Sequence, residues 1–323
     1  MEIKVCTTSE WNENEWWSYC KNFNLAFQSD SDIEKFKHSY LTTVDGHSYH
    51  ALLINDNLDI VGSCTVIPLL YKKNKENIKI GQAVGVFILE EYRSDPLMLR
   101  KMYHKLKDLL IRNGVVAVLA VPNSTSYSYW RNIVKWQDVG DLTYWALPIR
   151  VGNIINKWKF LNFISLTLSY LSLKIGNFLS LLMNNSQKKY KYEICKDEIF
   201  YKYRYSSAYK TIIIGKYLFI YILYNEKGIK TAYLLESYEN GNTTFKSIHK
   251  GVSYINKNNN VDIILYIGPL KLFQTVLLKV PKKIHPKRLP LTCDILLNDN
   301  KEYYSDMLEF SNWNFGLLNY DVR

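Results

Sequence analysis

Two adjacent carboxylates, Glu90 and Glu91, follow an apolar stretch at 78–89 that is typical of a β-strand. A carboxylate at the end of a strand can accept a proton from a bound substrate, directly or through a water molecule. Acidic residues at a strand end are also often simply solvated. The pair is therefore a candidate general base, with a solvated strand end as the competing interpretation.

Other residues that could do chemistry do not stand in a productive pattern. His47 and His50 have no Cys or acidic side chain at metal-ligand spacing, so we interpret them as turn residues and predict no metal site. The five cysteines form no Cys-x-x-Cys pair, which indicates reduced thiols rather than disulfides or zinc ligands. The sequence contains no G-x-S-x-G, Walker or G-x-G-x-x-G motif.

The composition indicates a globular protein with an anionic partner. A length of 323 residues leaves room for two domains, and 47% hydrophobic residues exclude global disorder. The net charge of +11 favours nucleic acid, a phosphorylated ligand or a membrane surface as partner. The densest basic stretch, 279–288, is either a solvated loop or a contact with a diphosphate or a membrane. Nucleic acid is disfavoured because no reader motif is present.

The first 150 residues alternate between helical and strand patterns in a definite order. Helices are predicted within 15–43, and a helix with an apolar stripe is predicted at 96–113, ending at Gly114. Strands are predicted at 49–54, 58–71, 78–89, 115–121 and within 136–149, and a short helix at 124–134. The N-terminus has no basic region followed by an apolar stretch, so we expect no secretory signal and a cytoplasmic protein.

This order resembles the GNAT (GCN5-related) N-acyltransferase fold, in which a central strand splays from its neighbour and acyl-coenzyme A enters the gap. The resemblance covers about residues 1–150 and is carried by three passages. They are NDNLDIVG (55–62), VFILEEYRS (86–94) and GVVAVLAVPNSTSYSYWRNIVKWQDVGDL (114–142). The Pro-Asn pair in the third passage resembles two-lobed members associated with surface-polysaccharide gene sets.

The resemblance implies a place for acetyl-CoA or another acyl-CoA as co-substrate. The backbone of the strand end would align the thioester, and the turn before the long helix would hold the pyrophosphate. The implied coenzyme-binding residues are Val86, Phe87, Ile88, Arg93, Ser94 and Asn123. The implied general base is Glu90 or Glu91. The family's general acid, a tyrosine seven residues after the Asn, corresponds to Trp130 here, so Tyr127 and Tyr129 are the candidates.

The coenzyme turn departs from the family pattern, because Pro96 and Met98 stand where the family has glycines. Asp95 followed by Pro96 is a favourable N-cap and N1 pair. An Asp cap would satisfy the helix donors itself and place negative charge where a phosphate should lie. The turn is therefore either a capped helix start in a lobe that binds no coenzyme, or a binding turn that relies on Arg93, Ser94, Arg100 and Lys101.

The segment 153–185 is a long apolar tract flanked by lysines. Asn162, Ser165, Ser169 and Ser172 fall on one helical stripe, which favours an amphipathic helix over a membrane span. We expect a linker helix between two lobes, with a helix on a membrane surface and a true span as the alternatives.

The second half repeats the order of the first in weaker form. Strands are predicted within 210–225, at 231–238 and at 261–268, helices at 243–258 and 269–278, and final strands in PLTCDILL (290–297) and in 312–323. FYKYRYSSAYK (200–210) and NWNFGLLNYDVR (312–323) resemble the beginning and end of second GNAT lobes. The predicted fold class is α/β (α+β), with two mainly antiparallel sheets flanked by helices. We predict GNAT-like lobes at 1–152 and 186–323, joined by a long helix at 153–185.

The resemblance implies an acyl-CoA-dependent N-acyltransferase that acts on the amino group of an amino sugar used in a surface polysaccharide. A peripheral membrane contact fits the basic segments, and the sequence does not indicate an oligomeric state. Two alternatives stay open. One is an aminoacyl-tRNA-dependent transferase of the peptidoglycan-bridge type, and the other is a non-catalytic scaffold, suggested by the missing glycines and by Trp130.

Overall fold

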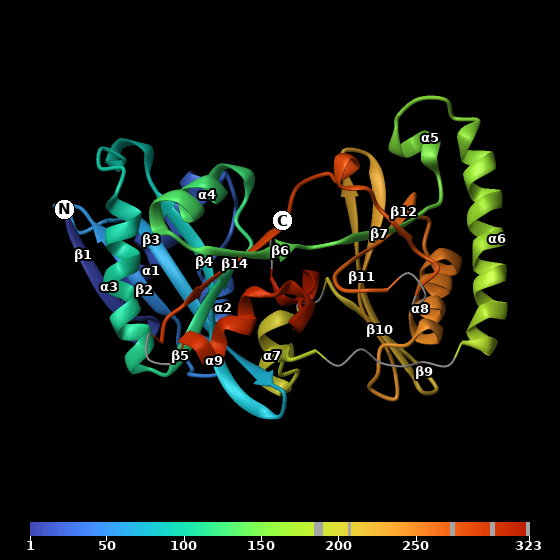
Figure 1. Cartoon of the computed structure of the whole chain (residues 1–323). Coiled ribbons are helices and arrows are strands. Elements are labelled where there is room, and N and C mark those ends of the chain that lie inside the picture. The colour runs from blue at the N-terminus through green and yellow to red at the C-terminus, as the bar shows by residue number, and fades with distance from the viewer. Residues whose placement is uncertain (184–189, 206–207, 272–274, 298–300, 321–323) are drawn as a thin grey trace.

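The structure is a computed structural model that describes residues 1–183, 190–205, 208–271, 275–297 and 301–320. The chain forms two β-sheets that lie side by side, with helices on their outer faces (Figure 1). Both sheets are mainly antiparallel and flanked by helices, so the predicted fold class is confirmed.

The first sheet has nine strands, and its main path runs β1-β2-β3-β4-β5-β14-β6. The strands on this path are β1 (Glu2–Thr7), β2 (Tyr49–Ile54), β3 (Ile60–Lys73), β4 (Glu76–Ile88), β5 (Val115–Ala120), β14 (Pro290–Ile295) and β6 (Gln137–Asp141). Two short strands extend it, because β8 (Tyr192–Ile194) pairs with β3 and β15 (Trp313–Asn314) pairs with β8. Along the main path only the β4–β5 pair is parallel.

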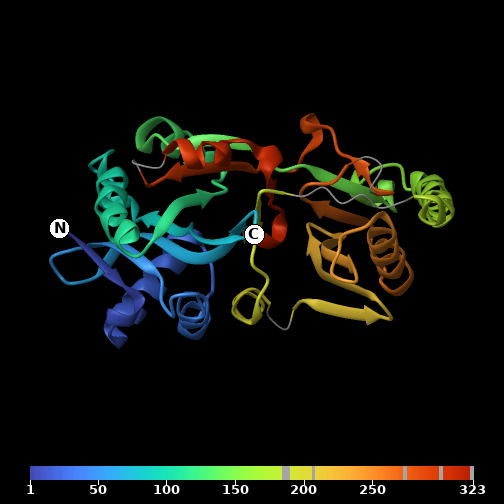
Figure 2. The same ribbon diagram turned by 60° about the horizontal axis from the view of Figure 1, so that its bottom comes forward.

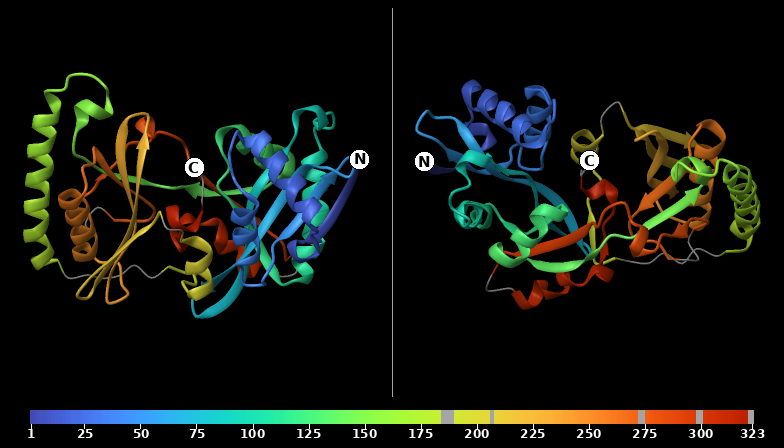
Figure 3. Two further views of the ribbon diagram at one scale, coloured as in Figure 1. Left: turned by 180° about the vertical axis from the view of Figure 1, so that it is seen from behind. Right: turned by 90° about the horizontal axis from the view of Figure 1, so that it is seen from above.

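Helices cover both faces of the first sheet (Figures 2 and 3). The helices α1 (Glu13–Phe27) and α2 (Ile33–Leu41) lie on one face, and α3 (Met98–Arg112) lies on the other. The predicted stripe of α3 is buried at Met102, Leu106 and Leu110, because residues three and four apart share one side of a helix. A short helix, α4 (Ser124–Tyr129), continues into one π-helical turn, Trp130–Val134.

The second sheet has six strands in the order β13-β7-β12-β11-β10-β9. They are β13 (Leu278–Lys279), β7 (Tyr144–Pro148), β12 (Ile263–Ile267), β11 (Ile229–Glu239), β10 (Tyr217–Glu226) and β9 (Lys210–Ile214). The helix α8 (Phe245–Asn258) packs on β10 and β11, and α6 (Leu161–Leu182) packs on the outer side of α8. Three short helices complete the chain: α5 (Val151–Ile154), α7 (Glu198–Arg204) and α9 (Lys301–Tyr304).

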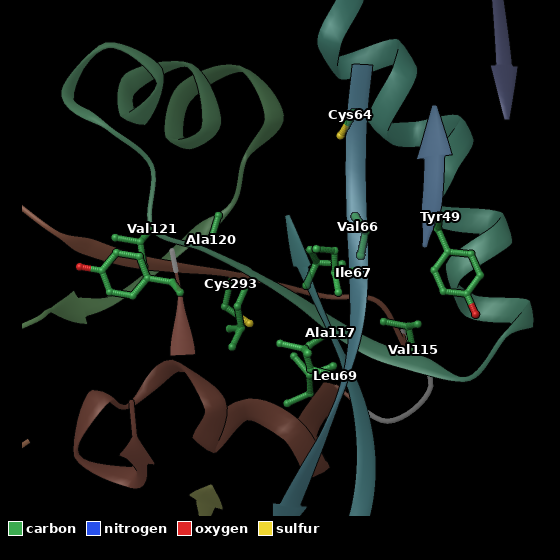
Figure 4. Packing of buried hydrophobic residues seen from close by; sticks show 14 of the residues in the cluster. Tyr49, Cys64, Val66, Ile67, Leu69, Val115, Ala117, Ala120, Val121 and Cys293 are labelled. Atoms are coloured by element: carbon green, nitrogen blue, oxygen red, sulfur yellow. The ribbon is translucent and has the colours of Figure 1, made fainter. Parts of the chain in front are cut away.

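The two halves of the chain exchange strands. β14, from the second half, lies between β5 and β6 of the first sheet, pairing Thr292 with Ala120 and Pro290 with Asp141. Figure 4 shows Cys293 of β14 packed near Ala117 and Ala120 of β5. In return β7, from the first half, lies next to β12 in the second sheet. The chain crosses from one sheet to the other within the two residues between β6 and β7.

The exchange changes the predicted domain organisation. The boundary at 152 separates two stretches of chain but not the two sheets, since β7 lies before it and belongs to the second sheet. Similarly β8, β14 and β15 come from the stretch 186–323 but belong to the first sheet. The predicted boundary at 185/186 lies outside the described residues.

Two further expectations differ from the structure. The helix α6 lies at the end of the molecule farthest from the N-terminus, outside α8, and not between the sheets as a packed linker would (Figures 1 and 2). It is the one helix in the described part of the chain that is long and apolar enough to cross a membrane. The described residues of 269–278 form no helix, and Leu278 begins the strand β13.

The strand exchange predicts that the two halves cannot fold separately. A chain of residues 1–152 lacks β14 and would leave the edge of the buried strand β5 without hydrogen-bond partners. We expect the fragments 1–152 and 153–323 to aggregate when each is expressed alone. When they are expressed together, we expect a tag on one fragment to retain the other at a 1:1 ratio, as measured by affinity purification. A soluble, cooperatively unfolding 1–152 fragment would contradict this.

Candidate functional site

The strands β4 and β5 diverge part-way along the first sheet. Their parallel ladder ends at the pair Gln82 and Leu119, whereas β4 continues to Ile88. Beyond Gln82, no described strand pairs with β4 on the β5 side. The four residues 83–86 are all partly exposed although β4 is a central strand. Solvent therefore reaches the β4 edge where the two strands separate, as the family resemblance requires.

A glycine shapes β4 within this divergence. Gly85 has φ +55°, a left-handed conformation that disfavours every residue with a Cβ atom. The β3–β4 register shifts by a bulge at the same place, between Ser63 and Thr65. A Cβ atom on Gly85 would lie 2.5 Å from Tyr19 Oη and 2.9 Å from Tyr40 Oη. The two phenol hydroxyls therefore converge on the β4 backbone.

These hydroxyls lie beside a buried polar cluster. Tyr19 Oη and Tyr40 Oη are 2.6 Å apart, and His50 bridges two threonines, with Nδ1 3.0 Å from Thr65 Oγ1 and Nε2 2.9 Å from Thr8 Oγ1. Burial raises the pKa of Tyr19 to about 12, and burial lowers the pKa of His50 to about 3. The cluster is therefore neutral at physiological pH and can donate hydrogen bonds without carrying charge.

An unpaired acceptor marks the point where the strands separate. Gln82 forms the last pair of the β4–β5 ladder and is only 7% exposed. Its Oε1 atom has no hydrogen-bond partner among the described residues. A buried amide oxygen without a partner is costly, so such groups often mark a place where a ligand binds. The amide of Gln82 can accept a hydrogen bond from a ligand N–H between the strands.

The turn before α3 is occupied by the protein's own carboxylate. Asp95 Oδ1 accepts a hydrogen bond from Leu97 N at 2.8 Å, and Asp95 Oδ2 forms an ion pair with Lys101 Nζ at 2.7 Å. The hydrogen bonds from Lys101 and Leu97 lower the pKa of Asp95, so it is a carboxylate at neutral pH. The prediction of Asp95 as the helix cap is wrong, because α3 begins at Met98, its N-cap residue is Leu97 and no side chain caps it. The turn therefore fits a pyrophosphate poorly.

The basic side chains around this turn remain on the surface. Arg93 is exposed and donates from Nε to Ile88 O at 2.7 Å, and Ser94 and Arg100 are exposed as well. Positive charge is therefore present both beside the end of β4, at Arg93, and on the first turn of α3, at Arg100.

The two candidate tyrosines have different surroundings. Tyr127 Oη donates to the Asp138 carboxylate, at 3.0 and 2.9 Å from its two oxygens, and Arg288 lies over the Tyr127 ring. Tyr129 Oη donates to Pro96 O at 2.6 Å and so links α4 to the turn before α3. Trp130 is buried against Trp136. Of the two phenols, only Tyr129 reaches the turn that follows β4.

The remaining predicted residues lie at the two strand ends. Glu90 and Glu91 are exposed in a 3-10 turn, Glu90–Tyr92, directly after β4. Asn123 caps α4, with its Oδ1 accepting from Ser126 N at 2.8 Å. Phe87 is buried, whereas Val86 and Ile88 are partly exposed. The structure thus places these residues at the ends of β4 and β5, with Glu90 and Glu91 in solvent.

A similar divergence in the second sheet is filled. The parallel β11–β12 ladder ends at Tyr233 and Leu265, while β11 continues to Glu239. The buried Glu236 carboxylate there is bound by Lys196, by Tyr205 Oη at 2.8 Å and by Tyr238 Oη at 2.6 Å. The segment around Gly316 packs against β12, and the remaining cavity measures ≈ 30 Å³, room for little more than a water molecule. The open divergence is therefore the one in the first sheet.

The histidine prediction is wrong for His50. This residue lies on β2 and is fully buried rather than in a turn. The apolar run YHALLI around His50 indicated a buried strand and could have corrected this prediction. Nothing in the sequence indicated that Tyr19 and Tyr40, which come from separate helices, would meet beside β4. Among the described residues, no group of three or more His, Cys, Asp or Glu side chains could hold a metal ion.

Comparison with solved structures identifies the fold. The chain is similar to a GCN5-related N-acetyltransferase from Anabaena variabilis ATCC 29413, with a TM-score of 0.56 and 10% identity, over 91% of this chain and 73% of the other. It is also similar to a conserved protein of unknown function from Enterococcus faecalis V583, described as a probable N-acyltransferase, with a TM-score of 0.55 and 11% identity, over 92% of this chain and 73% of that protein. The fold is thus GNAT-like. No family profile and no curated protein matches the sequence.

The neutral His50 predicts a loss of stability in acid. Its pKa is lower in the folded state than in the unfolded state, so its contribution is complete above about pH 6.5 and declines as the pH falls toward 3. Between pH 7.5 and pH 5 we expect His50 to remove about 2 kcal/mol from the free energy of unfolding. Urea denaturation at the two pH values measures this loss.

A pair of variants separates His50 from the other histidines. His50→Gln should reduce the loss of unfolding free energy between pH 7.5 and pH 5 by about 2 kcal/mol. His38→Gln, at an exposed position of α2, should lose as much free energy as the wild type. Burial also lowers the pKa of His249 to about 4, so a residual acid dependence is expected in both variants. Equal slopes in wild type and His50→Gln would contradict the assignment.

Proposed function

We propose that this protein is an acyl-CoA-dependent N-acyltransferase whose thioester binds where β4 and β5 of the first sheet diverge. The observation that carries the proposal is the ladder that stops at Gln82 while β4 continues, partly exposed, to Ile88. The GNAT-like fold supports it, since an open strand edge at this place is what the family uses to align the thioester.

The proposed reaction is a direct transfer. The neutral amine nitrogen of the acceptor attacks the thioester carbonyl, the new C–N bond forms, and the C–S bond breaks to release the coenzyme thiolate. One proton leaves the amine and one is taken up by the thiolate. The exposed pair Glu90 and Glu91 can accept the first through water. Tyr129 is the better acid candidate, because the Tyr127 hydroxyl is bound to a carboxylate.

The proposed coenzyme is acetyl-CoA or another acyl-CoA, with its amide-bearing arm beside Val86 to Ile88 and Gln82. Arg93 and Arg100 would meet the phosphates from the surface, because the Asp95 carboxylate occupies the turn before α3. The proposed acceptor is an amino sugar of a surface polysaccharide, in the cytoplasm. This acceptor rests on the resemblance of the passage that contains Pro122 and Asn123.

Gly85→Ala tests the site. A Cβ atom in this left-handed position would collide with two phenol oxygens, so β4 must shift at its open edge. We expect the variant to lose about 1–3 kcal/mol of stability and to bind acetyl-CoA at least about tenfold more weakly. Isothermal calorimetry measures the binding. Gly46→Ala is the matched control, because Gly46 also has a positive φ but has no atom within 4 Å of its Cβ position.

Gln82→Met separates binding from stability. The substitution removes an unpaired buried acceptor and keeps nearly the same volume, so we expect stability to stay equal or rise by about 1 kcal/mol. If Gln82 accepts a hydrogen bond from the coenzyme or the acceptor amine, the release of coenzyme thiol during turnover should fall about tenfold. If Gln82→Met keeps full turnover and Gly85→Ala binds the coenzyme normally, the reaction does not take place at the β4–β5 divergence.

A non-catalytic role is the second candidate. It is favoured by the Asp95 carboxylate in the turn before α3 and by Tyr127 bound to Asp138. Under this alternative the wild-type protein shows no calorimetric binding of acetyl-CoA and releases no thiol with any amino-sugar acceptor, whereas both variants remain folded.

A further inference from the structure

The helix α6 is oriented with its apolar side toward solvent. The side that packs on α8 and its neighbours carries small residues, all buried: Ser165, Ser169, Gly176 and Ser180. A Cβ atom on Gly176 would lie 2.3 Å from Val276 and 2.8 Å from His249 Nδ1, so this side approaches the protein closely. The large apolar residues point outward and are exposed: Phe163, Ile164, Leu168, Leu171, Ile175, Phe178, Leu181 and Leu182.

This orientation is the reverse of that in a surface helix of a water-soluble protein, which turns its apolar stripe to the core. Phe163 is 77% exposed, Phe178 61% and Leu181 73%, along more than four turns of one helix. A contiguous exposed apolar surface of this kind marks a binding surface. Close packing through Ser and Gly is how helices associate where the surrounding medium is itself apolar.

The charges around α6 indicate which partner covers it. The sequence contains no Asp or Glu between Asp141 and Glu193, although the chain has 30 acidic residues. Lys157, Lys159 and Lys174 are exposed within this stretch. Trp158 and Phe160 are exposed immediately before the helix. Cationic and aromatic side chains beside an apolar face are complementary to the headgroup region of an anionic bilayer.

The position of Lys174 favours a helix that lies on the bilayer over one that crosses it. At 100° per residue, Leu171, Phe178 and Leu182 form the centre of the apolar face, and Lys174 lies near one margin of it, on the side of Tyr170 and Asn177. Lys174 Nζ lies 5.4 Å from the centre of the Tyr170 ring, and from that side it can reach lipid phosphates. In a spanning helix the same lysine would lie near the middle of the hydrocarbon. The helix α8, which packs on α6 and carries several lysines, would also have to enter the membrane.

We propose that α6 is a membrane-binding surface, which places its outward apolar face in the headgroup region of an anionic phospholipid bilayer with the helix axis parallel to the membrane. The bilayer buries the exposed leucines and phenylalanines, and the lysines around α6 contact the lipid phosphates. This proposal concerns the end of the molecule farthest from the β4–β5 divergence and does not depend on the proposed acyl transfer.

The proposal is tested with the full chain and lipid vesicles. In flotation with vesicles of phosphatidylglycerol and phosphatidylcholine in equal amounts, we expect the wild-type protein to float with the lipid. With vesicles of phosphatidylcholine alone, we expect binding at least about tenfold weaker. Binding to the mixed vesicles should decline as the salt concentration rises from about 0.1 M to about 0.5 M. Failure of the protein to float with the anionic vesicles would overturn the proposal.

A matched pair of double variants assigns the binding to α6. Phe163→Ser with Phe178→Ser should reduce the bound fraction at least about tenfold and leave the unfolding temperature unchanged, because both side chains are exposed. Trp17→Ser with Leu25→Ser, at comparably exposed positions of α1 on the first sheet, should bind as the wild type does. Equal loss in both double variants would overturn the assignment to α6.

Sedimentation equilibrium without lipid tests the competing occupant, a second copy of the chain. We expect a monomer in both the wild type and the Phe163→Ser, Phe178→Ser variant. A stable wild-type dimer that this variant dissociates would mean that a second copy covers α6, and the membrane proposal would be overturned.

Discussion

The exchange of β7 and β14 is the constraint on which the rest of this structure depends. β5 is buried along its whole length, and its backbone groups must find partners on both sides. β4 supplies them on one side only as far as Leu119, and β14 supplies them on the other. Because that second partner comes from residues 290–295, the first sheet is incomplete until most of the chain has been made. The two sheets also share a core, because Ile222 of β10 and Leu235 of β11 belong to the same buried cluster as the residues of the first sheet.

The same pairing explains why one divergence can serve a ligand and the other cannot. In both sheets a parallel pair of strands separates while one strand continues, which leaves an edge of unpaired backbone. In the second sheet the chain itself fills the space, with Glu236 bound by Lys196 and the segment around Gly316 packed on β12. In the first sheet the edge stays partly exposed, and a bulge at Gly85 and the unpaired amide of Gln82 lie along it. A substrate that binds at this edge can donate a hydrogen bond to the unpaired acceptor and form hydrogen bonds with the free backbone groups of β4.

Many elements could be predicted because their signals are local. The stripe Met102, Leu106 and Leu110 needs only helical period, so α3 was found within two residues of its observed start. The local signal misled at Asp95 and Pro96, which were predicted as N-cap and first helical residue, because α3 begins only at Met98. The cluster of Tyr19, Tyr40 and His50 could not be found, because its members come from two helices and a strand that meet only after folding. The same holds for β14, whose sequence indicates a strand but not the sheet to which it belongs.

The sequence by itself determined most of the helices and strands, the fold class, and the presence of an apolar segment with basic flanks at 153–185. These properties follow from periodicity, composition and charge, which are carried by residues near one another in the chain. Only the tertiary structure decided which strands were exchanged, which divergence stayed open, and which side of α6 faced outward. The reason is that hydrogen-bond partners across a sheet and the choice of a buried helix face depend on residues far away in sequence. For α6 the local pattern of small residues was visible, yet its meaning came from α8, against which those residues pack.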